Sequence, residues 1–484
     1  MLPPKKVFHF ILLALSSVLF LSFVSETIAG KKQETIFKYF KISDIVGYRA
    51  FAEAKHLEVE EQKALVEAKR KKEESIKKIS SKADTLQFMI QQSQLDSTKF
   101  FYASGIKDFW FPIFEEWAKL KKDKKLYRIL HYGDSQIEMD RITSHIREKL
   151  QSRYGGSGPG ILPPLQLVPS YTISQTASGN WQRLVSYGAS NTRAPHNRYG
   201  ITGMIFRYNG GNAQVSISPR EKKYRLVRNF ETVKVITGAY NRSFTVSLQN
   251  GNTTLSQLVP SEGKEQLIKW QLDSNKSNVS LNFQSDSITD ILGIAIDGKY
   301  GIAMDNIPWR GSSGLTFTSI NKASLSQTYK FLNVRMVIMQ FGGNSMPYIK
   351  DPKAAERYAA SFAKQIDYIR SIDTSIKILV IGPADMSTNI DGSMQTPKML
   401  EYCIQKMAEE ANKRGAAFWS MYHAMGGKNS MVKWVKRSPA YGAPDYIHFS
   451  KIGAEEMSKI FYSAIEREYQ IYMFHKNMEA LKVD

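Results

Sequence analysis

From about residue 126, short apolar runs alternate with amphipathic stretches along the chain. The apolar runs are Tyr127–Tyr132, Val334–Phe341, Ile376–Ile381 and, more weakly, Ala416–Trp419. Segments with helical periodicity lie at about 136–153, 353–371 and 395–414, and a last helix follows His448. A strand followed by a helix, repeated, predicts a parallel sheet covered by helices on both faces.

The interval from 166 to 298 departs from this rhythm. It contains short strand-like runs at Gln214–Ser218, Glu231–Ile236, Ser243–Leu248, Leu267–Leu272 and Asn278–Phe283. Turn signals separate these runs, as at Asn209–Asn212 and Asn250–Asn252. Several short strands at this spacing predict an antiparallel β-sandwich inserted into the α/β domain.

The first thirty residues have the composition of an export segment. Lys5 and Lys6 precede the apolar run Val7–Val24, and small residues follow it. A cleaved signal peptide and an uncleaved membrane anchor both fit residues 1–30. Either one predicts an exported protein, located in the periplasm or on the outer face of the cytoplasmic membrane.

We interpret residues 31–98 as a charged helical spacer. Within them, residues 53–84 are rich in Ala, Glu and Lys and lack Gly and Pro, which is typical of a solvated helix with i,i+4 ion pairs. Such a helix could hold the rest of the chain away from a membrane or form a short coiled-coil arm. Because apolar heptads are not sustained, a surface helix packed on the body fits equally well.

Charge and cysteine content narrow the function classes. The 484-residue chain has 66 Lys plus Arg against 45 Asp plus Glu, a formal net charge of +21. This excess is spread over every segment with no basic arm, so we expect attraction to an anionic envelope and no nucleic-acid partner. Cys403 is the single cysteine, and the eight histidines form no HExxH pattern. Internal disulfides, a metal site and a cofactor are therefore not expected.

Candidate chemistry follows the predicted strands, because ligands in open α/β sheets bind beyond the carboxyl ends of the strands. After the first strand, Gly133-Asp134-Ser135-Gln136 places a serine at a strand-to-helix turn. Here the hydroxyl can project into a cleft, and the backbone N–H can face a developing oxyanion.

Two further loops provide candidate oxyanion donors. The glycine-punctuated loop after the insert contains Gly311 and Gly314, where a backbone N–H can approach a substrate oxygen closely. Gly342-Gly343-Asn344 follows the strand that ends at Phe341 and presents an amide side chain, a good neutral donor.

The last loop provides a candidate base. Asp445 stands three residues before His448, and Ser450 can cap the final helix. A carboxylate at this spacing can bend back to hold one imidazole nitrogen while the other faces the serine. Taken together, the loops supply a nucleophile, three oxyanion donors, a base and a residue that orients the base.

In these four blocks the chain resembles the SGNH (GDSL-type) hydrolase superfamily. The resemblance implies that Ser135 is the nucleophile, His448 the general base and Asp445 its orienter. It also implies an oxyanion hole formed by the N–H groups of Ser135 and Gly314 and by the Asn344 side chain. Gly314 is preferred to Gly311 because it fits the family's Gly-x-Ser-Gly spacing. The chain departs from the family at Gln136, usually leucine, and at Ser345, often aspartate; neither departure removes a catalytic group.

The architecture also resembles the peptidoglycan O-acetylesterases of Gram-negative bacteria, in which a carbohydrate-binding-like β-sandwich separates the first two blocks. The segments Ile291–Asp297 and Gly301–Asn306 look like the junction that leaves this sandwich. The expected fold is a three-layer, flavodoxin-like SGNH hydrolase with a parallel sheet, an inserted antiparallel sandwich and an N-terminal helical segment. The hydrolase would occupy residues 99–165 and 299–475, and the sandwich residues 166–298.

The expected function is removal of O-acetyl groups from a cell-envelope polysaccharide, peptidoglycan above all, through a Ser-His-Asp triad and an acyl-enzyme. Two alternatives remain: a polysaccharide O-acetyltransferase that works with a membrane partner, and a non-enzymatic wall-binding protein with a relict triad. In the insert, Trp181, Tyr187 and Tyr208 could stack on a glycan, although we favour a place in the sandwich core. Asp140 and Arg141, which follow the serine, could touch substrate, but we favour a place on the surface or a role in supporting the residues that touch it.

Overall fold

The computed structural model describes residues 8–10, 12–14, 16–17, 60–69, 85, 88–92, 96–103, 105–220, 223–272 and 278–480. The chain divides into two compact units, Met1–Thr85 and Leu86–Asp484. Among the described residues, no helix combines the length and apolarity that a membrane crossing needs. The signal or anchor predicted at 1–30 and the spacer predicted at 31–98 fall largely outside these residues, although 60–69 are helical and exposed.

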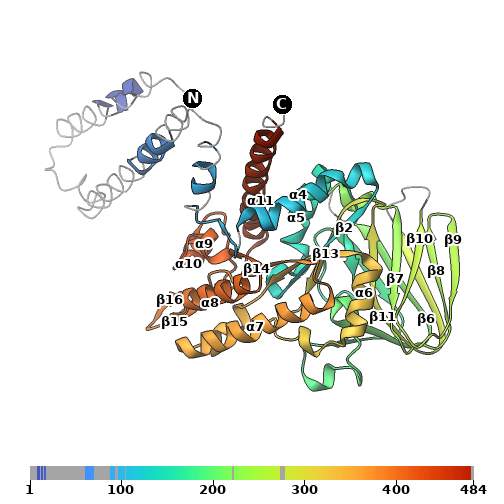
Figure 1. Cartoon of the computed structure of the whole chain (residues 1–484). Helices are drawn as coiled ribbons and strands as arrows, with labels where there is room; N and C mark the ends of the chain where they lie inside the picture. The colour runs from blue at the N-terminus through green and yellow to red at the C-terminus, as the bar shows by residue number, and fades with distance from the viewer. Residues whose placement is uncertain are drawn as a thin grey trace, which may run out of the picture. The chain divides into compact units, whose positions relative to one another are not determined.

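The second unit is built around a six-stranded sheet with the order β1-β17-β14-β13-β2-β12 (Figure 1). The strands are β1 (Phe100–Phe101), β2 (Leu126–Gly133), β12 (Gly301–Pro308), β13 (Val334–Gln340), β14 (Lys377–Gly382) and β17 (Ala417–Ser420). All pairings are parallel except that of β1 with β17. The predicted parallel sheet is confirmed, and both β2 and β13 are almost entirely buried, as expected of strands covered on both faces.

Helices cover both faces of this sheet. They are α4 (Ile106–Asp123), α5 (Thr143–Tyr154), α6 (Lys322–Leu332), α7 (Pro352–Ile372), α8 (Leu400–Lys413), α9 (Met421–Met425), α10 (Ser430–Lys436) and α11 (Lys451–Ala480). Alternate residues of β13 separate into two cores: Val337 and Met339 pack with α6, α7 and α8, whereas Met336 and Ile338 pack with α4, α5 and α11. The mixed α/β architecture therefore has a layer of helices on each side of the parallel sheet.

Between β2 and β12 the chain forms a nine-stranded antiparallel sheet. Its strands are β3 (Gly160–Leu162), β4 (Ile173–Ser178), β5 (Trp181–Val185), β6 (Met204–Pro219), β7 (Thr232–Thr237), β8 (Phe244–Asn250), β9 (Thr253–Val259), β10 (Gln266–Gln271) and β11 (Val279–Asp297). The first part of β11 pairs with β6 and β8 and its last part with β7 and β3, and these strands share one apolar core. Because β3 already pairs with β11, the antiparallel region begins before the predicted boundary at 166.

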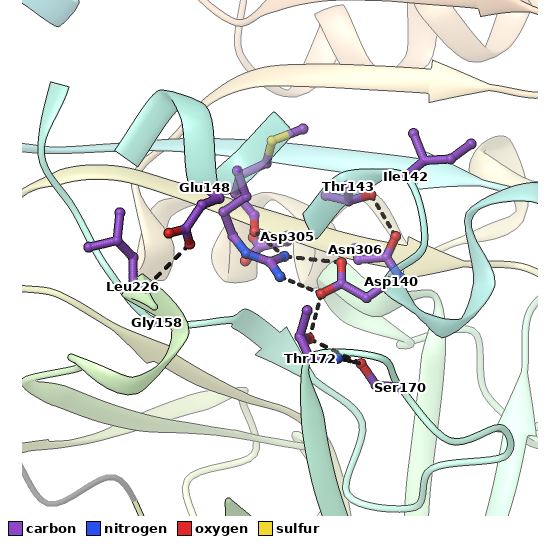
Figure 2. A network of polar contacts seen from close by, with 12 residues as sticks. Asp140, Ile142, Thr143, Glu148, Gly158, Ser170, Thr172, Leu226, Asp305 and Asn306 are labelled. Atoms are coloured by element: carbon purple, nitrogen blue, oxygen red, sulfur yellow. Dashed lines mark hydrogen bonds and ion pairs between the residues drawn. The ribbon is translucent and has the colours of Figure 1, made fainter. Parts of the chain in front are cut away.

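A network of polar contacts, buried around Asp140, joins the antiparallel region to the α/β body (Figure 2). Asp140 accepts hydrogen bonds from Arg147 of α5 and, at 2.7 Å, from the Thr172 hydroxyl just before β4. Glu148 of α5 accepts the backbone N–H groups of Arg225 and Leu226 at 3.2 and 3.3 Å. Buried charges that are paired in this way fix the relative placement of the elements that carry them.

Candidate active site

The nucleophile candidate lies where β2 ends. The short helix η1 (Ser135–Asp140) begins directly after the strand, and the Asp134 carboxylate accepts the Gln136 N–H at 2.9 Å as its cap. Gly133 permits this turn because a Cβ there would lie 3.1 Å from the Gln340 carbonyl oxygen on β13. Ser135 is half-buried, so its hydroxyl is held in place but remains accessible.

The structure brings the three predicted triad residues together. The Ser135 Oγ lies 2.8 Å from His448 Nε2, and His448 Nδ1 lies 2.7 Å from Asp445 Oδ2. The other Asp445 oxygen accepts the N–H groups of Ile447 and His448, both at 2.9 Å. Partial burial raises the pKa of Asp445, but hydrogen bonds from His448 and Ile447 outweigh it and hold that pKa below its usual value.

This arrangement fixes the proton positions. An ionised carboxylate can only accept, so the proton between Asp445 and His448 belongs on Nδ1 of the imidazole. Nε2 is then free to accept the hydroxyl proton of Ser135. The geometry therefore suits His448 to act as a general base toward Ser135.

Asn344 stands beside the triad, at the start of η6 (Gly343–Tyr348) after β13. Its Nδ2 donates to Asp134 Oδ2 and to the Ser312 carbonyl, both at 3.2 Å. Burial raises the pKa of Asp134 to about 6, even though the Gln136 N–H and the charge of His448 lower it. Asp134 thus links the nucleophile turn to the amide predicted as an oxyanion donor.

The predicted oxyanion donor Gly314 is not among the residues that line the pocket containing Ser135. Its N–H donates to the Ser312 Oγ at 3.1 Å, and a Cβ at this position would lie 2.6 Å from the Phe341 ring. Gly314 therefore packs behind the site. Gly311 lines the pocket together with Ser135, Asn344 and His448, as the competing position in the same loop.

Two adjoining pockets open at these residues. The first, of about 430 Å³, contains Ser135 and His448. The second, of about 480 Å³, extends from it toward Tyr187 and Arg357. Both include Gly311, Asn344 and Tyr348, so we call the two together the active-site groove. Their volumes fall in the range of ligand pockets. Within the described part of the chain, no cluster of three His, Cys, Asp or Glu side chains could hold a metal.

The fold has a counterpart among solved structures. A peptidoglycan O-acetylesterase superposes with a TM-score of 0.61 and 21% sequence identity, over 76% of this chain and 98% of that chain. The chain therefore shares the fold of this peptidoglycan O-acetylesterase. The resemblance seen in the sequence is thereby confirmed at the level of the fold.

Two further solved structures match less well. A family two carbohydrate esterase from Cellvibrio japonicus has 8% identity and a TM-score of 0.24, over 62% of this chain and 99% of that one. A GDSL-like lipase from Bacteroides ovatus has 9% identity and a TM-score of 0.25, over 62% of this chain and 98% of that one. No protein-family model matches the chain, and no curated protein does.

Two residues that follow Ser135 hold the candidate site together, and the sequence suggested such a supporting role as one possibility for Arg141 but not for Gln136. The Gln136 amide donates to the Ile447 carbonyl at 2.5 Å and accepts the Phe449 N–H at 3.3 Å, so it brackets His448. Arg141 donates to the carbonyls of Ser135 and Phe449 at 3.1 and 3.2 Å. Both side chains therefore tie the nucleophile turn to the loop of the base.

The other candidates from the sequence separate clearly. Tyr208 is buried, and Trp181 packs on its ring at a centroid distance of 5.3 Å, so both belong to the core of the antiparallel region. Tyr187 stacks on Trp309 at 5.4 Å and lines the groove. Asp140 is buried in the network of Figure 2 and does not reach the pocket that holds Ser135.

Proposed function

We propose that the chain is a serine esterase that removes O-acetyl groups from a polysaccharide. The observation that carries this proposal is the continuous hydrogen-bonded path from Ser135 through His448 to Asp445, at 2.8 and 2.7 Å, on the wall of a pocket. The fold shared with a peptidoglycan O-acetylesterase supports the same activity. The assembled triad also favours an enzyme over a wall-binding protein with a relict site.

In the proposed reaction, His448 Nε2 takes the hydroxyl proton as the Ser135 Oγ attacks the acetyl carbonyl. The C–O bond to the sugar breaks, and the leaving sugar oxygen receives that proton from His448. Water, deprotonated by His448 in turn, then attacks the acetyl-serine. The bond between the acyl carbon and Ser135 Oγ breaks, Oγ takes the proton from His448, and acetate is released. Asp445 stabilises the imidazolium in both half-reactions.

The tetrahedral oxyanion would be held by the N–H groups of Ser135 and Gly311 and by Asn344 Nδ2. Because Asn344 already donates to Asp134 and Ser312, it must exchange the Ser312 contact for the oxyanion while it keeps Asp134. Asn344→Ala should therefore lower kcat about 10²- to 10³-fold, as the loss of one oxyanion donor does elsewhere. Acetate release per unit time, with the folded state checked by circular dichroism, measures this loss.

The substrate proposed from the sequence is a cell-envelope polysaccharide, with peptidoglycan first. The export segment predicted at 1–30 would place the enzyme in the periplasm or hold it at the membrane. The nine-stranded antiparallel region would act as a carbohydrate-binding-like sandwich that positions the glycan. Acetate release from O-acetylated peptidoglycan, compared with release from acetylated xylan, tests this order of substrates.

Three measurements on the purified protein test the activity itself. Wild type should release acetate from p-nitrophenyl acetate in plain buffer, and Ser135→Ala should lose nearly all of this activity. A fluorophosphonate probe should label wild type at Ser135, whereas a wall-binding protein would remain unlabelled. An enzyme that turns over only when a glycan acceptor is added would instead be an O-acetyltransferase.

A further inference from the structure

Two cations on the active-site groove lack partners. Lys350 lines the part of the groove that holds Ser135, and Arg357 lines the part that extends toward Tyr187. Both side chains are exposed, and neither forms an ion pair with any residue in the described part of the chain. Their positive charges are therefore available to a ligand in the groove.

The acidic residues next to these cations in sequence are engaged elsewhere. Asp351 caps helix α7 by accepting the Ala354 N–H at 2.8 Å. Glu356 accepts the Tyr402 hydroxyl at 2.7 Å. These contacts hold both carboxylates within the protein, and neither carboxylate forms an ion pair with Lys350 or Arg357.

The groove itself offers no free carboxylate. Of the described residues that line it, Asp134 is the one carboxylic acid, and it is buried against Asn344 and the Gln136 N–H. Arg310, just outside the groove, differs from Lys350 and Arg357 because it is paired: it donates two hydrogen bonds of 2.7 Å to Glu138. The free charge along the groove is positive.

An aromatic side chain lies where the two parts of the groove meet. Tyr348 lines both pockets and is 81% exposed, which is unusual for a large ring. A sugar ring can pack its apolar face on such a surface. Tyr348 and Lys350 lie close together in sequence, beside the start of α7, which carries Arg357.

We propose that the groove binds an anionic glycan, in which Arg357 and Lys350 pair with carboxylates on sugars next to the acetylated one and Tyr348 stacks on a sugar ring. The guanidinium fork suits a carboxylate held by two hydrogen bonds, and the ammonium group adds a point charge. This inference rests on the proposed esterase activity and specifies its substrate class.

The test compares three esters: p-nitrophenyl acetate, an O-acetylated polyuronate, and the same polymer after reduction of its carboxyl groups. Wild type should have a higher kcat/KM on the polyuronate than on the reduced polymer, and the preference should shrink at high salt. Lys350→Ala/Arg357→Ala should lower kcat/KM on the polyuronate about tenfold, mainly through KM, and lower kcat/KM on the reduced polymer much less.

Lys322→Ala/Lys364→Ala removes the same charge from α6 and α7 outside the groove and serves as the matched control. Equal activity of the two double variants on the polyuronate, or a wild-type preference for the reduced polymer, would overturn the inference. Absence of p-nitrophenyl acetate hydrolysis would instead defeat the esterase proposal. In that case, equal binding of the deacetylated polyuronate to wild type and Lys350→Ala/Arg357→Ala, measured by calorimetry, still refutes the anionic site.

Discussion

Replacing Gln136 with leucine, the residue usual in the family, tests whether its amide positions the general base. The side chain now spans His448, donating to the carbonyl before it and accepting the N–H after it. Leucine fills a similar volume but makes neither contact. The Asp445 carboxylate would still accept the hydrogen bond from the imidazole, but the two hydrogen bonds between Gln136 and the loop of His448 would be lost.

The size of the effect follows from two hydrogen bonds. Each contributes about 0.5–1.5 kcal/mol net, so about 1–3 kcal/mol holds the loop of His448 against the nucleophile turn. If this free energy serves to align Nε2 with the Ser135 hydroxyl, kcat should fall about 5- to 150-fold, since about 1.4 kcal/mol corresponds to tenfold. KM for a small ester should change little, because Gln136 acts on the base and not on substrate binding.

The assay is steady-state hydrolysis of p-nitrophenyl acetate together with urea unfolding. Gln151→Leu is a matched control, because this buried amide also bridges two backbone groups, the carbonyls of Gly158 and Ile302 at 3.2 Å, away from the groove. We expect both variants to lose stability and Gln136→Leu alone to lose kcat. Equal kcat values for the two variants would refute the positioning role.

Further predictions concern the charge and space around the triad. Asp445→Asn should lower kcat about 10⁴-fold at unchanged fold, because an amide cannot hold the same imidazole tautomer; retained activity would exclude the triad. Burial raises the pKa of Asp134 to about 6 from 3.8, so its contribution to stability is lost as the pH rises from about 4 to 6. The free energy of unfolding of Asp134→Asn, measured with urea, should therefore rise by up to about 3 kcal/mol relative to that of wild type over this pH range. Gly314→Ala should lose stability because the added Cβ would collide with Phe341. Gly311→Ala has open space around its Cβ, but alanine is strained at the positive φ of this position, so a shift of the N–H should lower kcat at a smaller cost in melting temperature.

The parallel strands were predictable because burial on both faces leaves an unbroken apolar run. β2, β13 and β14 appear in the sequence at nearly the positions that the structure gives them. β12 was taken only for a junction, because its run is interrupted by the polar pair Asp305 and Asn306. Asp305 is buried there as the partner of Arg128, at 2.6 and 2.8 Å, and a contact between distant strands leaves no local signal.

The antiparallel region was harder to delimit for a related reason. β9 is exposed along almost its whole length, and β4 is mostly polar, so neither shows the alternation that identifies a half-buried strand. β3 has three residues and pairs with β11, more than a hundred positions away. Edge strands and long-range pairings are determined by their partners, and their own composition carries little of that information.

The candidate site residues could be predicted from the sequence, because each belongs to a short motif of neighbouring residues in one loop. Ser135 and Asn344 were predicted from their places directly after a strand, and Asp445 and His448 from the loop before the last helix. The structure places these four residues around one pocket or in hydrogen-bonded contact with it. The role of Gln136 in holding the loop of His448 could not be predicted in this way. The bracket that Gln136 forms around His448 joins positions more than three hundred residues apart, and glutamine in a turn has no distinctive meaning by itself.

The two glycines of the second block show where local reasoning ends. Both have positive φ, 74° at Gly311 and 78° at Gly314, so both satisfy the backbone requirement that glycine meets and differ only in their surroundings. One faces open space and the other faces Phe341, a residue at the end of another strand. The spacing within the motif cannot distinguish them, because the deciding contact comes from β13.

The same limit explains why Lys350 and Arg357 stood out only in the structure. In a chain of net charge +21, a lysine or arginine indicates a binding site for an anion only when the structure shows that the neighbouring carboxylates form hydrogen bonds elsewhere.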